Sequence, residues 1–238
     1  MRRWAGQPLL GTRPGGRRLA WALLITCMVV VFGLGAAFAH QATADGFDRV
    51  LDDPVIDLLR GHGTLRGWMQ YPGTQVPAVV LSIGMAIGCL WQRRLNGVAL
   101  ALTADFIATR LDDPFLKDLF HRTYLGALSY PSGHTTSIVT LTAVYAVLFL
   151  LPPRETPRRG LRLAGLVALL ALTVITVLGV MGLRWHYFTD AVGGAAVAVG
   201  TVCALSLGLD ASLRWLGLAP GEDAATIDVA HLTRRLRR

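Results

Sequence analysis

Hydrophobic residues occur in blocks along this chain, and each block is close to the roughly 20 residues that a helix needs to cross a bilayer. Polar residues gather between the blocks, in short segments that contain most of the arginines. This alternation predicts an all-α protein, a bundle of six transmembrane helices. We expect the spans at residues 19–39, 76–92, 95–111, 134–151, 163–182 and 190–209.

The first block has a second interpretation, as a signal peptide. Arg17 and Arg18 precede it, and residues 36–39 offer small side chains of the kind found at cleavage sites. However, the block is longer than the ~7–15-residue apolar core of a signal peptide. We therefore interpret it as a span.

The segments outside the spans divide the chain into three parts. Residues 1–17 are rich in Arg, Gly and Pro, which predicts a disordered cytoplasmic tail. The six-span domain then covers residues 18–212, and residues 213–238 form a second cytoplasmic tail. Within the loop 40–75, apolar and acidic residues alternate in a way that predicts an amphipathic helix on the membrane surface, which Pro54 starts or breaks.

Composition supports a membrane protein and fixes its expected orientation. The chain is 53% hydrophobic and only 16% charged, with a net charge of +8. Its arginines cluster before the first span, between spans two and three, between spans four and five, and after span six. All four clusters fall on one side of a six-span arrangement, and the positive-inside rule makes that side cytoplasmic. We therefore predict a multi-pass plasma-membrane protein with both termini in the cytoplasm.

The same distribution bears on partners. Basic residues dispersed over several cytoplasmic segments indicate topology and attraction to anionic lipid headgroups, so we do not expect nucleic-acid binding. Cys27, Cys89 and Cys203 each lie within an apolar block, which predicts small buried side chains and no disulfide. The sequence has no Cys/His spacing typical of a zinc site, and it leaves the oligomeric state open.

Two basic residues stand out in the second outward loop, residues 112–133. Lys117 is the only lysine of the chain, and Arg122 follows five residues later. A guanidinium offers a planar fork to phosphate oxygens and an ammonium a point charge, so both are candidate phosphate-binding residues. The alternative is that they anchor the ends of spans at the interface, and Arg184 is open to the same two interpretations.

A Pro-Ser-Gly-His turn leads into the fourth span. Ser132 is a natural helix N-cap, and Gly133 allows a ligand to approach the exposed N–H groups of the first turn. His134 at this position could donate a proton to a leaving oxygen. An ordinary helix cap is the alternative for this segment.

A second histidine precedes the sixth span. On a helix, His186 and Asp190 would be four residues apart on one face. A carboxylate bonded to one imidazole nitrogen would fix the tautomer and leave the other nitrogen free to attack. The alternative is a His-Asp cap at the start of the span. All three clusters fall on the outward side, which favours one composite site.

These motifs together resemble the three signatures of the type 2 phosphatidic acid phosphatase superfamily, over roughly residues 76–205. The resemblance implies a helical bundle that hydrolyses phosphoesters without a metal or other cofactor. It also implies that His186 attacks phosphorus to form a phosphohistidine, that Asp190 orients His186, and that His134 protonates the leaving group.

The chain departs from the family pattern at two places. The Arg-Pro expected seven residues after the lysine is Tyr124-Leu125 here, and Arg122 is the nearest arginine. The arginine expected six residues before the third histidine is Val180 here. Arg184 follows one helical turn later, and we predict that it presents its guanidinium from the same helix face.

We therefore predict an integral-membrane lipid phosphatase with an outward-facing site, acting on a lipid phosphate or an isoprenoid diphosphate. One alternative is a lipid phosphotransferase that passes the phosphoryl group or the headgroup to an acceptor alcohol. Another is a six-span membrane protein without catalytic activity. A haloperoxidase, the soluble branch of the superfamily, does not suit a chain with these apolar blocks.

Overall fold

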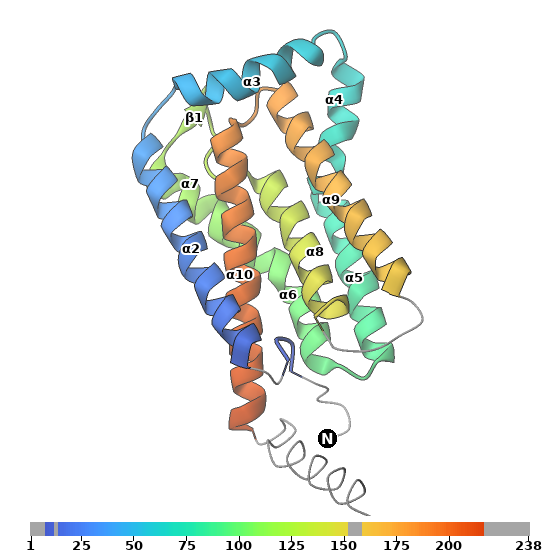
Figure 1. Ribbon diagram of the computed structural model, residues 1–238. Helices are drawn as coiled ribbons and strands as arrows, with labels where there is room; N and C mark the ends of the chain where they lie inside the picture. Colours follow the sequence, from blue (N-terminus) through green and yellow to red (C-terminus); the bar gives the residue numbers. More distant parts are fainter. Residues whose placement is uncertain (1–7, 12–13, 152–158, 217–238) are drawn as a thin grey trace, which may run out of the picture.

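Long helices running side by side form most of this protein, and a shorter helix lies across one end of them (Figure 1). The computed structural model describes residues 8–11, 14–151 and 159–216. The long helices are α2 (Pro14–Phe38), α5 (Gln75–Trp91), α6 (Leu95–Arg110), α8 (Gly133–Phe149), α9 (Arg159–Gly182) and α10 (Phe188–Trp215). The shorter elements are α3 (Gly46–Leu58), α4 (Gly63–Gln70), η1 (Tyr71–Gly73), the π-helical turn η2 (Leu111–Leu116), α7 (Lys117–Phe120) and the two strands β1 (Thr123–Tyr124) and β2 (Ala127–Leu128).

The prediction of an all-α bundle is confirmed, because the described residues contain no sheet beyond the two-stranded β1–β2 hairpin. Each of the six predicted spans coincides with one long helix, with ends that differ by a few residues. Within the part of the chain that the structure describes, four helical stretches have the length and apolar composition to cross a membrane; one of them is the continuous run Gly63–Trp91, which joins α4 to α5. Helix α8 is apolar but shorter. The protein is therefore a membrane protein, while six spans remain a prediction.

Helix α10 is central to the bundle and packs against α2, α8 and α6 (Figure 1). Small residues near its start allow this. A Cβ at Gly193 would lie 2.4 Å from the ring of Tyr130, and a Cβ at Gly194 would lie 2.5 Å from the carbonyl oxygen of Ser132. Only glycine permits such close approach of backbone and ring. The Tyr130 hydroxyl then donates to the carbonyl oxygen of Val31 in α2 at 2.7 Å, so α2 is an integral part of the bundle. This packing favours a membrane span over a signal peptide.

The N-terminal boundary predicted at residue 18 needs correction. Helix α2 already begins at Pro14, and Leu9 and Leu10 are buried. Their backbone N–H groups donate to the carboxylate of Asp210 in α10, at 2.7 and 3.0 Å. Two buried leucines and this carboxylate hold the segment against the bundle. The rest of the predicted N-terminal tail (1–7 and 12–13) and residues 217–238 of the C-terminal tail lie outside the described residues.

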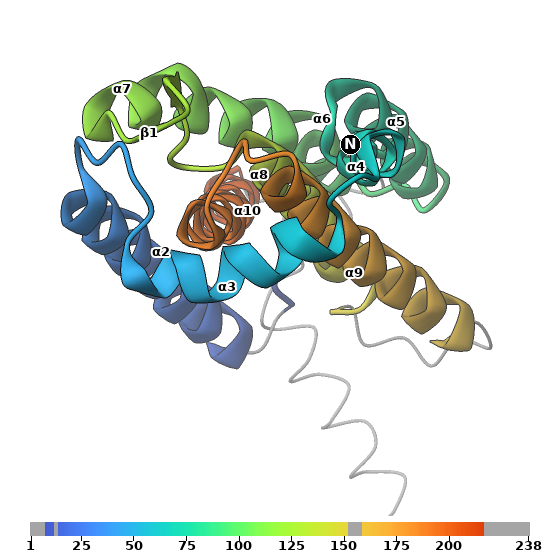
Figure 2. The same ribbon diagram turned by 90° about the horizontal axis from the view of Figure 1, so that it is seen from above.

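Helix α3 lies across the end of the bundle, next to the start of α10 (Figures 1 and 2). Pro54 lies inside this helix, so the predicted break or start at Pro54 is wrong. The acidic face points inward: Asp48 accepts from the backbone N–H of Thr189 at 3.0 Å, and Asp52 accepts from that of Phe188 at 3.1 Å. These N–H groups have no partner within α10, and carboxylates at a helix N-terminus are favoured by the helix dipole. Helix α3 therefore caps α10.

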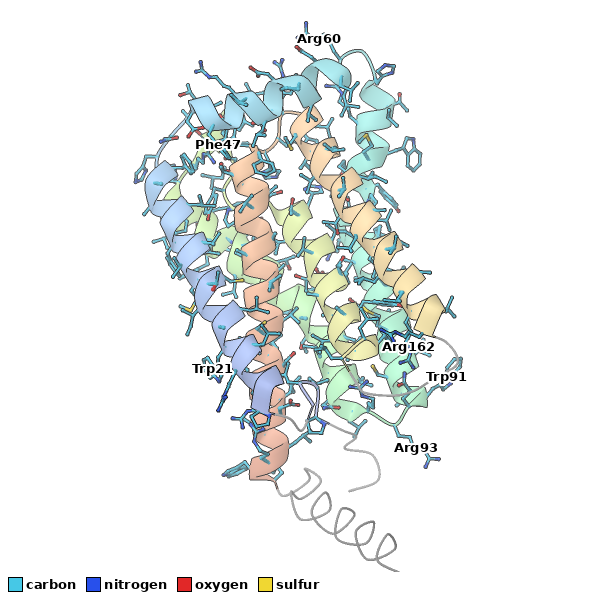
Figure 3. The ribbon with its side chains drawn as sticks, viewed as in Figure 1. Trp21, Phe47, Arg60, Trp91, Arg93 and Arg162 are labelled. Atoms are coloured by element: carbon cyan, nitrogen blue, oxygen red, sulfur yellow. The ribbon has the colours of Figure 1, made fainter. Side chains whose placement is uncertain are left out.

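The two ends of the bundle differ in the residues they present. Phe47 and Arg60 lie at the α3 end, and Trp91, Arg93 and Arg162 lie at the opposite end (Figure 3). Arg93 and Arg162 belong to the arginine clusters that the sequence assigns to the cytoplasm. Cys89 and Cys203 are buried, as predicted, whereas Cys27 is only half-buried.

Candidate functional site

A cavity of about 1010 Å³ opens at the α3 end of the long helices. Its walls come from α5, α6, η2, the β1–β2 hairpin, the start of α8 and the loop between α9 and α10. Five of the eight residues selected from the sequence line it, namely Lys117, Gly133, His134, Arg184 and His186. The other three, Arg122, Ser132 and Asp190, are fully buried behind this wall.

His186 lies in the loop before α10, with only 6% of its surface exposed. Its Nδ1 is 2.8 Å from the carbonyl oxygen of Ser129, and a carbonyl can only accept, so Nδ1 carries the proton. Nε2 is then the unprotonated nitrogen. Burial, with the nearby positive charge of Lys117, lowers the pKa of His186 to about 3. The imidazole is therefore neutral at physiological pH, which is the state a nucleophile needs.

The predicted pairing of His186 with Asp190 needs correction. Helix α10 begins at Phe188, so His186 is not on the helix with Asp190, and Nδ1 is 3.9 Å from the nearer carboxylate oxygen. Asp190 instead accepts from the backbone N–H of Tyr187 at 2.9 Å and caps its own helix. The Ser129 carbonyl fixes the tautomer of His186. Asp190 instead holds the loop that carries His186, through its hydrogen bond with the N–H of Tyr187.

Arg122 also has a different position from the one predicted. Its guanidinium is 0% exposed and donates to Asp190, Thr189 and Asp48, each at 2.6 Å. The rings of Phe38 and Tyr187 flank it, with centroids 4.4 and 4.3 Å from the guanidinium carbon. Charge-assisted hydrogen bonds therefore occupy the two terminal nitrogens of the guanidinium, and aromatic rings pack against its plane. Arg122 connects α3 to α10 behind the cavity, and we revise its predicted role in phosphate binding accordingly.

His134 faces His186 across the cavity, with ring centroids 6.3 Å apart. It is the second residue of α8, and Ser132 occupies the N-cap position of this helix as predicted. The Ser132 hydroxyl makes no capping bond, however, and accepts from Thr135 Oγ1 at 3.1 Å instead. The first-turn N–H groups of α8 therefore lack a side-chain cap and lie next to the two histidines.

Two cationic side chains border this space. Lys117 follows η2, in which Asp113 has extended backbone angles (φ −126°, ψ 117°). Arg184 follows the end of α9 at Gly182 and adopts a left-handed conformation, with φ 59°. The predicted placement of Arg184 on a face of the preceding helix is therefore wrong. The turn itself directs this arginine to the cavity.

Two residues of the site were not selected from the sequence. Ser129 contributes a backbone carbonyl, which no side-chain pattern can reveal. Asp112 lines the cavity with a fully buried carboxyl group, and its sequence signal, an aspartate two residues before Pro114, is typical of an ordinary helix start. Among the described residues, no group of three or more His, Cys, Asp or Glu side chains is arranged to hold a metal ion.

Comparison with known proteins adds one finding. Searches of curated proteins and of solved structures found no match. A family model described as the PAP2 superfamily matches residues 98–212. This range contains Lys117, both cavity histidines and the loop that bears Arg184. The resemblance to the type 2 phosphatidic acid phosphatases is thereby confirmed over these residues.

Proposed function

We propose that this protein is an integral-membrane phosphatase that hydrolyses a lipid phosphate or an isoprenoid diphosphate through a phosphohistidine. The observation that carries the proposal is the state of His186. Its Nδ1 proton is engaged by the Ser129 carbonyl, and burial keeps the ring neutral. A buried, neutral and oriented imidazole beside a cavity with a second histidine and two cations is suited to attack on phosphorus.

The proposed first step forms a bond between Nε2 of His186 and phosphorus and breaks the bond from phosphorus to the leaving oxygen. The phosphoryl group would lie in the space between the two imidazoles, whose centroids are 6.3 Å apart. Lys117, Arg184 and the first-turn N–H groups of α8 would stabilise the charge on its oxygens, as preorganised donors do in a transition state. His134 would protonate the leaving oxygen.

The proposed second step releases phosphate. Water attacks phosphorus and gives a proton to His134, which lost its own proton in the first step. The phosphorus–Nε2 bond breaks, inorganic phosphate is released, and neutral His186 is regenerated. No divalent cation takes part in this scheme, because two cations and the helix N-terminus supply the positive charge. We therefore expect activity in the presence of EDTA.

A lipid substrate is supported by the extension of the cavity between α5 and α6. Its walls there include Val79, Ile83, Leu102 and Phe106, which are apolar and partly exposed. Such a wall suits an acyl or isoprenoid chain better than a polar soluble ester. The phosphate would lie at the α3 end and the chain would extend towards the membrane interior. We place this end outside the cell, since Arg93 and Arg162 lie at the other end (Figure 3).

The test is phosphate release by purified protein in detergent, with phosphatidate and a polyprenyl diphosphate as substrates and EDTA present. We expect wild-type protein to release phosphate and to accumulate an acid-labile phosphoenzyme after rapid quenching. His186→Ala should abolish both signals, and His62→Ala, which removes an exposed histidine outside the cavity, should change neither.

Three results would contradict the proposal. Full activity in a folded His186→Ala variant would place the chemistry elsewhere. Strict dependence on a divalent cation would exclude the metal-free scheme. Headgroup transfer to an added alcohol with no net phosphate release would identify a phosphotransferase instead.

A further inference from the structure

Asp112 occupies an unusual position at the wall of the cavity. It lies in η2, where the backbone N–H of Lys117 donates to the carbonyl oxygen of Asp112, five residues earlier. Such π-helical turns are frequent at functional sites. Both Asp112 and Lys117 line the cavity in consequence.

The carboxyl group of Asp112 is 0% exposed, and neither of its oxygens has a hydrogen-bond partner among the described residues. It lies against the first residue of α8: a Cβ at Gly133 would be 2.9 Å from Oδ2. This contact gives a physical reason for glycine in the Pro-Ser-Gly-His turn. A buried polar group without a partner destabilises the fold, so its presence beside His134 calls for a ligand.

The charges around Asp112 bear on its protonation. Titratable or charged groups face it from every neighbouring element. Its own segment contributes Lys117 and Asp113, and α6 contributes Asp105 and Arg110. The other groups are His134 from α8, Arg184 and His186 from the loop before α10, and Asp190 from α10. Burial is the largest influence and raises the pKa of Asp112 to about 8, with Asp113 and Asp190 acting in the same direction and Lys117 against them. The acid form therefore predominates near neutral pH.

We propose that Asp112 is a phosphate-binding residue that donates a hydrogen bond from its uncharged carboxyl group to a phosphoryl oxygen of the substrate. This inference rests on the proposed function of the cavity. A carboxylate at this place would repel a phosphate, whereas a carboxylic acid offers an O–H donor. Buried acids kept neutral for this purpose occur in other enzymes. The bound phosphate would further favour the acid form.

A pH dependence follows from this arrangement. Loss of the Asp112 proton removes the donor and adds a negative charge, so only the protonated enzyme binds well. Loss of the proton of His134, the proposed acid, gives a decline of its own at lower pH, because burial and the charge of Lys117 lower the pKa of His134. Above the pKa of Asp112 in the free enzyme, kcat/KM should fall by about a further tenfold per pH unit. Asparagine keeps the size and an N–H donor but does not titrate. Asp112→Asn should therefore bind phosphate without this further decline.

The experiment compares wild type, Asp112→Asn, Asp112→Ala and the control Asp118→Asn from about pH 6 to 9.5. Asp118 is an exposed aspartate in the same segment that does not line the cavity. With one lipid substrate throughout, we expect Asp112→Asn to stay within a few-fold of wild type at pH 6 and to lose the further decline above about pH 8. Asp112→Ala should be roughly 10- to 100-fold slower at pH 6, the effect of one hydrogen bond to a charged group. The control should follow wild type.

Binding of tungstate, which remains a dianion over this range, separates this inference from the proposed function. If no lipid is hydrolysed, tungstate affinity still reports on Asp112 and should decline above about pH 8 in wild type only. An unchanged decline in Asp112→Asn, or a folded Asp112→Asn without tungstate binding at any pH, would overturn the inference. If the variant fails to fold, wild-type affinity that is flat with pH would overturn it, and a tenfold decline per unit would support it.

Discussion

Replacing Arg122 with methionine tests whether this arginine has a structural role or binds phosphate. In Arg122→Met the side chain keeps much of its volume but loses the guanidinium. Two buried carboxylates, those of Asp48 and Asp190, then lose a charged partner at 2.6 Å. Removing one partner of a buried ion pair typically costs about 3–5 kcal/mol, because the remaining charge is left uncompensated. At about 2–4 °C per kcal/mol, we expect a Tm roughly 6–20 °C lower.

The assay is thermal unfolding in detergent, with Arg60→Met as the control. Arg60 forms an ion pair with Asp57, and both side chains are largely exposed, so its loss should cost less than about 1 kcal/mol. Adding Asp48→Asn to Arg122→Met removes one of the stranded charges and should recover part of the stability. Interacting residues show such non-additivity in a double-mutant cycle.

One combination of results would refute the structural role of Arg122. If Arg122→Met unfolds at the wild-type temperature and loses only oxyanion binding, Arg122 is a phosphate ligand, as its place in the sequence suggests. The contacts with Asp48 and Asp190 would then not represent its role. A folded variant with a wild-type Tm and full tungstate affinity would contradict both interpretations.

Three further predictions follow from the structure. Arg184→Ala should lower kcat/KM about 10²–10³-fold, the usual effect of losing a donor to a charged transition state, and a wild-type rate would make Arg184 an interfacial anchor only. Gly193→Ala should lower the free energy of unfolding by about 1–3 kcal/mol, because its Cβ would meet a buried tyrosine ring at 2.4 Å, whereas Gly84→Ala has open space and should be neutral or slightly stabilising. A cysteine replacing Arg60 should react with an impermeant maleimide in spheroplasts, and one replacing Arg93 should be protected; the reverse pattern would place the site in the cytoplasm.

Much of the helical arrangement could be predicted from the sequence, because membrane-like helices depend on local properties of the chain. Each apolar block satisfies its own backbone hydrogen bonds as a helix, so its place along the sequence is nearly sufficient to define it. For the same reason Lys117, His134 and His186 could be selected in advance. They lie where helices begin or end, and those ends meet at one cavity.

The connections between these side chains were decided only by the tertiary structure. His186 bonds to the carbonyl of Ser129, 57 residues away, because α10 begins two residues after the histidine and leaves Asp190 3.9 Å from it. Arg122 lies behind the cavity wall because it pairs with Asp48, 74 residues away on a helix whose acidic face points inward. Hydrogen-bond partners are set within a few tenths of an ångström by packing between distant segments, whereas a sequence pattern fixes position only to within a helical turn.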